Sequence, residues 1–144
     1  MDVGKVDPPT ARTVAPSQSW LRAVIFGLAY FVVGIVTSSL PASDQGRVIR
    51  LAAWAASSVL YAAHIGYEHF GLRNSPRSVA LHAAIAVASG ALGLAVAATL
   101  HALLTAHFRP AYLVAMVAWP AITAFPALLV ALAVSALLAR LRRR

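Results

Sequence analysis

The 144-residue sequence contains no cysteine, and only four of its residues are acidic. Without cysteine the chain cannot form disulfides, thiolate nucleophiles, CxxC redox pairs or cysteine-ligated zinc and iron–sulfur centres. Charged residues of both signs make up 11% of the chain, whereas an ordinary soluble domain has about 25%. These shortages exclude a secreted disulfide scaffold, a disordered regulator and a typical soluble enzyme.

Apolar residues dominate the sequence. They make up 60% of it, and the mean hydropathy is +0.77. A soluble fold of this size needs far more polar surface to stay dispersed in water. The composition therefore predicts a small integral membrane protein.

Four apolar segments are long enough to cross a bilayer, since about 20 helical residues span a hydrocarbon core of about 30 Å. They cover about residues 20–40, 48–70, 76–106 and 111–139. No segment alternates apolar and polar residues as a strand would, and lipid excludes irregular backbone. Because the loops are short, neighbouring spans should run antiparallel. We therefore expect residues 20–139 to form an all-α, integral membrane four-helix up-down bundle.

The ends of the chain are polar. Residues 1–19 contain three prolines, both charge signs and little apolar bulk, which predicts a disordered cytoplasmic tail. Residues 140–144 form a basic cytoplasmic tail, and we expect Arg140–Arg144 to bind the anionic headgroups of the lipid bilayer. No basic face is interleaved with aromatic residues, so nucleic acid is not an expected partner.

The basic residues also predict the orientation. Nine of the twelve lie on one side of the predicted bundle, and Arg47, Arg50 and Arg109 lie on the other. The positive-inside rule then places the N- and C-termini in the cytoplasm. The alanine- and arginine-rich usage is typical of a GC-rich bacterial genome, so we expect a multi-pass protein of the cell inner membrane.

Small residues recur at helical spacing in the first and third spans. In lipid, helices associate through small residues that let their backbones approach closely. We therefore expect helix packing, within the chain or between copies, through five residues: Gly27, Gly34, Ala86, Gly90 and Gly93.

The second span carries the only extended polar stripe of the sequence. Polar residues at steps of three and four share one helix face, and such faces usually point into a bundle. The stripe consists of Trp54, Ser57, Ser58, Tyr61, His64 and Glu68. His82 and Ser89 lie on a facing stripe of the third span. His64 and His82 are at similar depth near the second loop, so they can converge with Glu68.

Several interpretations of this convergence are open. Two facing imidazoles, His64 and His82, can ligate a haem or contribute to a divalent metal site. A path through the stripe can carry a substrate or relay protons, and it would comprise Tyr61, His64, Glu68, His82 and Ser89. Alternatively, Glu68 and His69 lie at the membrane interface in water, and the other two imidazoles hydrogen-bond internally. Two histidines and one carboxylate match no established metal or catalytic motif, so we predict no cofactor and no catalytic residue.

The sequence thus favours a small, non-catalytic membrane protein, a structural or accessory component that forms a homo-oligomer or joins a larger complex. The alternatives are a small transporter or channel with His64 and Glu68 as a proton-sensitive pair, and a haem- or metal-binding protein. The length and the four spans resemble those of small multidrug transporters. Those transporters carry a membrane-embedded carboxylate in the first span, and residues 20–40 contain none.

Overall fold

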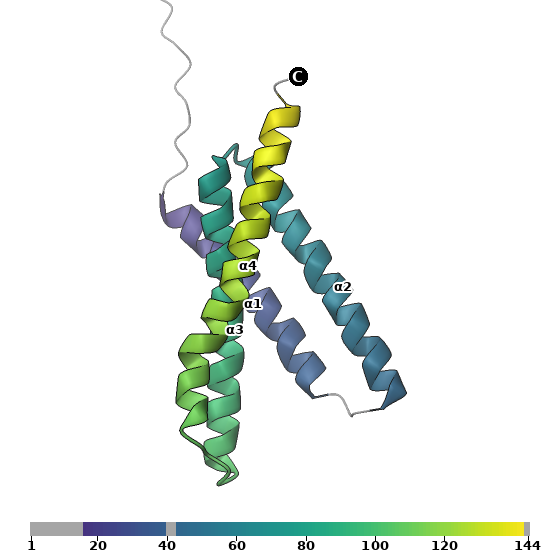
Figure 1. Ribbon diagram of the computed structural model, residues 1–144, viewed down its shortest axis with the longest axis vertical. Coiled ribbons are helices and arrows are strands. Elements are labelled where there is room, and N and C mark those ends of the chain that lie inside the picture. Colours follow the sequence, from purple (N-terminus) through teal and green to yellow (C-terminus); the bar gives the residue numbers. More distant parts are fainter. Residues whose placement is uncertain (1–15, 40–42, 143–144) are drawn as a thin grey trace, which may run out of the picture.

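The computed structural model describes residues 16–39 and 43–142, and these residues are almost entirely helical (Figure 1). The elements are α1 (Pro16–Ser38), α2 (Asp44–Gly66), the π-helical turn η1 (Tyr67–Gly71), α3 (Pro76–Leu104) and α4 (Ala111–Leu141). No strand occurs in the two described ranges, which confirms the predicted all-α class. Most of the predicted N-terminal tail (1–15) and residues 143–144 of the basic tail lie outside these ranges, whereas residues 16–19 belong to α1.

Four helical stretches are long and apolar enough to cross a membrane. They are Leu21–Ser38, Asp44–Gly71, Pro76–Leu104 and Ala111–Leu141. Many large apolar side chains face outward, among them Trp54 and Val117, each 75% exposed. Lipid tails solvate such side chains well. These features support a small multi-pass membrane protein.

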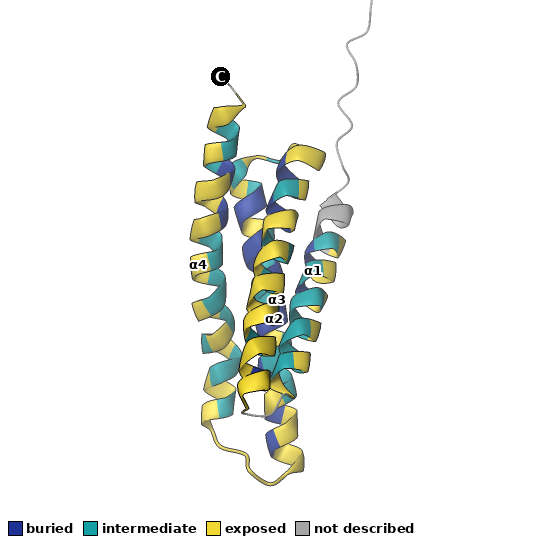
Figure 2. Ribbon diagram, turned by 90° about the vertical axis from the view of Figure 1, so that its right-hand side faces the viewer, coloured by how far each residue is buried: buried dark blue, intermediate teal, exposed yellow. Residues whose placement is uncertain are grey.

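Helix α3 is the centre of the molecule. Most of the buried residues belong to it, and it packs against α4 on one side and α1 on another (Figure 2). Its start is well defined, since the Ser75 hydroxyl accepts a hydrogen bond from the Ser78 N–H (3.3 Å) and Pro76 stands in the first turn. Both features favour the beginning of a helix.

Helices α1 and α3 approach each other through glycine. A Cβ atom placed on Gly90 would lie 2.8 Å from the Tyr30 Cβ and 3.0 Å from the Gly27 carbonyl oxygen. A Cβ on Gly27 would lie 3.0 Å from the Ser89 Cβ and 3.1 Å from the Ala86 carbonyl oxygen. The two backbones can therefore pack at this distance only because both positions lack a side chain.

The remaining two predicted packing residues lie at the same contact between α1 and α3. Gly34 faces the side chain of Leu94, and Gly93 faces the ring of Phe31. All five small residues that the sequence predicted to pack thus lie at one intramolecular contact, between α1 and α3.

The four helices lie close together at one end of the molecule and diverge toward the other. A small apolar core joins α2, α3 and α4 near the α2–α3 connection, which we call the α2–α3 end. It consists of Ile65, Val79, Ala80, Ala83 and Ala131. Toward the opposite, α3–α4 end, α1 and α2 diverge from α3 and α4 (Figure 1). Most of α2 is therefore exposed there.

The glycine contact yields a test with a matched pair of substitutions. We expect Gly90→Ala to destabilise the protein by about 1–3 kcal/mol, the usual cost of overpacking. Gly66→Ala should cause no loss, because nothing lies within 4 Å of a Cβ atom at Gly66 and alanine suits a helix better than glycine. The stabilities of both variants are measured by thermal unfolding in detergent, monitored by circular dichroism. Equal melting temperatures for the two variants would contradict the close packing.

Candidate functional site

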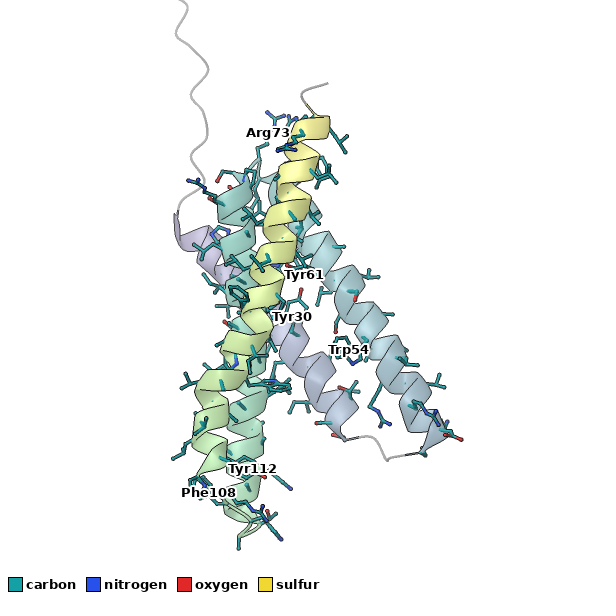
Figure 3. The ribbon with its side chains drawn as sticks, in the orientation of Figure 1. Tyr30, Trp54, Tyr61, Arg73, Phe108 and Tyr112 are labelled. Atoms are coloured by element: carbon teal, nitrogen blue, oxygen red, sulfur yellow. The ribbon has the colours of Figure 1, made fainter. Side chains whose placement is uncertain are left out.

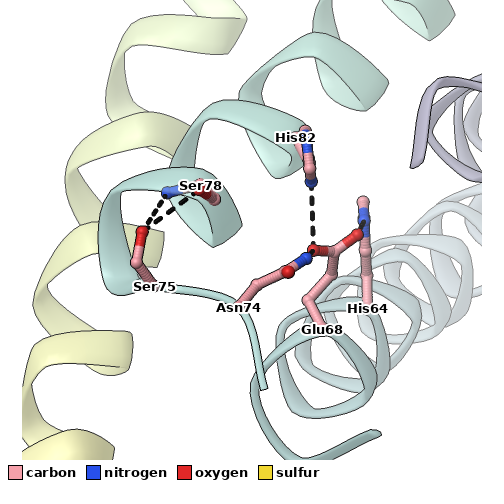
Figure 4. Close-up of polar contacts among 6 residues, drawn as sticks. All are labelled: His64, Glu68, Asn74, Ser75, Ser78 and His82. Carbon is pink, nitrogen blue, oxygen red and sulfur yellow. Dashed lines mark hydrogen bonds and ion pairs between the residues drawn. The ribbon is translucent and has the colours of Figure 1, made fainter. Parts of the chain in front are cut away.

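The structure brings together side chains from α2, η1, the following loop and α3 (Figure 4). The Glu68 Oε2 accepts a hydrogen bond from the Asn74 side-chain amide and hydrogen-bonds with the His82 Nδ1 at 3.0 Å. The Glu68 Oε1 lies 3.9 Å from the His64 Nε2, which is too long for a hydrogen bond. We call these four residues (His64, Glu68, Asn74 and His82) the His–Glu cluster.

Local backbone structure positions the cluster. Helix α2 widens into a π-helical turn at Tyr67–Gly71, a feature that is frequent at functional sites. The turn ends where the Leu72 N–H donates to the Tyr67 carbonyl (3.2 Å) and the Asn74 N–H donates to the Glu68 carbonyl (3.2 Å). Between them Arg73 has a positive φ of 54°, which reverses the chain. Asn74 is thereby folded back over Glu68.

The cluster is buried. His64 is 0% exposed, Glu68 is 1% exposed and the neighbouring His69 is 5% exposed. The alternative expectation that Glu68 and His69 lie in water at the interface is therefore wrong. The physical reason is the π-turn and the reversed loop after it, which bring both side chains into the protein and supply partners to the carboxylate from Asn74 and His82.

Helix α1 covers the cluster from a third side. The Phe26 ring stacks on the His64 imidazole, with centroids 3.9 Å apart and planes at 2°. Close by, the Arg22 guanidinium lies over the Tyr67 ring, 5.6 Å from its centroid, at a distance typical of a cation–π contact. The polar groups at this end thus connect α1, α2, η1 and α3.

Two residues of the predicted path lie apart from the cluster. The Tyr61 hydroxyl donates to the Ala127 carbonyl of α4, and Figure 3 shows Tyr61 and Tyr30 in the middle of the molecule. The Ser89 hydroxyl donates to the Ile85 carbonyl of its own helix (2.8 Å). The structure therefore joins three of the five predicted path residues and gives the other two separate partners.

Sequence reasoning missed Asn74 and Phe26. A loop asparagine and a membrane-span phenylalanine are common, and neither has a spacing that marks it. The only sequence signals for the cluster were the i, i+4 spacing of His64 and Glu68 and the predicted depth of His82 in the membrane.

The residues present do not fit a haem or a metal ion. An axially ligated haem would have to lie between the two imidazoles, but the Glu68 carboxylate occupies that position, with one oxygen toward each. Within residues 16–39 and 43–142, no three His, Asp or Glu side chains are arranged to hold a metal ion. The pairing of His64 and His82 around a cofactor is therefore not supported.

A separate cleft of about 1100 Å³ opens between the diverging helices and is lined by residues of all four. No member of the His–Glu cluster lines it. Comparisons with protein families, with curated proteins and with solved structures found no match for this chain.

The cluster predicts a difference between two acidic residues. We expect Glu68→Gln to destabilise the protein by about 1.5–3 kcal/mol, the range for hydrogen bonds to a charged group. Asp44→Asn makes the same chemical change in an exposed ion pair with Arg47 and should have no measurable effect. Melting temperatures of the two purified variants decide this. A fully stable Glu68→Gln variant would show that the cluster does not hold the helices together.

Proposed function

We propose that this protein is a non-catalytic structural or accessory component of the bacterial cell inner membrane. Its four helices form an up-down bundle with both termini in the cytoplasm. The observation that carries the proposal is that the polar side chains most suited to chemistry, those of the His–Glu cluster and Tyr61, contact other parts of the same chain and do not line the large cleft.

Each of these contacts joins different elements. His82 of α3 bonds to Glu68 of η1, and Tyr61 of α2 bonds to the backbone of α4. His64 stacks on Phe26 of α1. Charged and polar pairs are strong in a low-dielectric interior, so they are well suited to fixing helix positions. The large cleft does not reach the His–Glu cluster. A substrate that entered the cleft would therefore not contact these side chains.

A proton-conducting channel is the second candidate, and one observation favours it. Both ring nitrogens of His64 and the Glu68 Oε1 are buried without a hydrogen-bond partner. A shift of about 1 Å would bring the His64 Nε2 and Glu68 Oε1 to hydrogen-bonding distance. A proton could then pass between His64, Glu68 and His82.

The proposed orientation predicts the behaviour of reporter fusions. Green fluorescent protein fused after Arg144 should fluoresce, and alkaline phosphatase fused there should be inactive, because the positive-inside rule puts this end in the cytoplasm. Alkaline phosphatase fused after His107, between α3 and α4, should be active. The reverse activity pattern would mean that the bundle is inserted the other way round.

The proposed role is tested by particle mass and by proton flux. In a mild detergent, light scattering should give a particle larger than one 15.1 kDa chain, containing either further copies or other proteins. A monodisperse single chain would contradict a component role. Proteoliposomes with a pH-sensitive dye inside should acidify no faster than empty vesicles.

The variants used above separate the two candidates. Flux by the wild type that Glu68→Gln abolishes and Asp44→Asn preserves would establish the channel instead. A matching melting curve for each variant shows whether a change in flux reflects chemistry or unfolding.

A further inference from the structure

The cleft between the diverging helices suits an uncharged ligand. Among its described lining residues Arg50 is the one Lys, Arg, Asp or Glu, and Arg50 already has an interaction partner. The described lining therefore does not favour an ionic ligand of either sign. The volume of the cleft, about 1100 Å³, is at the upper limit of pockets for drug-sized ligands, about 300–1,000 Å³.

Aromatic side chains with a polar group line the cleft. Four of the seven tryptophan and tyrosine residues of the chain belong to the lining, and none of the five phenylalanines does. The four are Tyr30 of α1, Trp54 of α2, and Tyr112 and Trp119 of α4. The lining on α3 is mostly glycine and alanine, which leaves room beside these rings. Because aromatic rings stack on other planar π-systems, the lining suits a planar, apolar body.

The two tryptophans of the lining favour a ligand with hydrogen-bond acceptors. An indole N–H donates a hydrogen bond and cannot accept one, whereas the hydroxyl groups of the lining can do either. Within the described residues, neither Trp54 nor Trp119 has a hydrogen-bond partner for its indole N–H. Both side chains are exposed, so a molecule in the cleft can reach them. An N–H group left unpaired in an apolar environment is costly, and an acceptor on the ligand removes that cost.

We propose that the cleft binds an uncharged, planar ring that carries carbonyl oxygens, which is the chemical class of the quinones. The carbonyl oxygens accept hydrogen bonds from the indole N–H groups of Trp54 and Trp119, and the ring packs against the glycine and alanine residues of α3. The cleft is larger than a single ring, so apolar substituents of the ligand occupy the rest of it. This binding site is independent of the role proposed above for the His–Glu cluster.

Two molecules with the same tetramethyl ring test the carbonyl groups, since duroquinone has them and durene lacks them. The chain contains no cysteine, so the quinone cannot react with a thiol of the protein. In phosphatidylcholine vesicles we expect duroquinone to quench the tryptophan fluorescence saturably. Durene should bind about ten-fold more weakly, the effect of losing two hydrogen bonds, as measured by its displacement of duroquinone.

Single substitutions locate the donors. Trp54→Phe and Trp119→Phe each remove one indole N–H, keep an aromatic ring and leave the other tryptophan of the cleft as the reporter. Each should reduce the preference for duroquinone to about three-fold, the effect of the one remaining hydrogen bond. Tyr67→Phe is the matched control, because it removes a donor from a residue that does not line the cleft, and it should keep the full preference. Circular dichroism confirms that each variant is folded.

Four results would overturn the proposal. The first is equal binding of duroquinone and durene by the wild type, and the second is a full preference in both tryptophan variants. The third is an equal loss of preference in these variants and in Tyr67→Phe, which would indicate an effect outside the cleft. The fourth is quenching that does not saturate, which would mean that duroquinone only dissolves in the bilayer.

Discussion

A carboxylate between membrane helices needs partners that replace water, and the position of α2 depends on how Glu68 obtains them. Asn74 and His82 bond to one of its oxygens, and His64 lies near the other. These groups come from α2, the loop and α3, so they bring the C-terminal part of α2 against the rest of the bundle. The π-turn and the reversal at Arg73 make this possible without a long connection. Two further contacts of α2 lie within two turns of this carboxylate, since Tyr61 bonds to the α4 backbone and His64 stacks on Phe26 of α1.

The second constraint is the glycine contact between α1 and α3. Because Gly27 and Gly90 face each other without side chains, the two helices touch at that height. The His–Glu cluster fixes the helices on one side of this contact. On the other side, no comparable set of buried hydrogen bonds joins the described parts of α1 and α2 to α3 and α4. The helices diverge on the side of the glycine contact that faces away from the polar cluster (Figure 1).

Much of the fold and part of the His–Glu cluster could be predicted from the sequence. Uninterrupted apolar runs predicted the helices, and the i, i+4 spacing with the depth of His82 indicated that His64, Glu68 and His82 can converge. The burial of Glu68 could not be predicted, because it depends on a π-turn and on Asn74, neither of which has a periodic pattern. The cleft could not be predicted either. It results from helix tilt, and α3 is so uniformly apolar and small that its pattern does not select a contact face. Orientation in the membrane remains a prediction.

The divergence of α1 and α2 from α3 and α4 also enlarges the surface that the molecule presents to its surroundings (Figure 1). Aromatic side chains along the cleft stay accessible, among them Trp54 (75% exposed) and Trp119 (52% exposed). In a membrane such exposure costs little, because acyl chains are as apolar as these side chains. In water the same arrangement would leave large apolar side chains in contact with solvent, so the open form is one that a bilayer or a detergent micelle can support and water cannot.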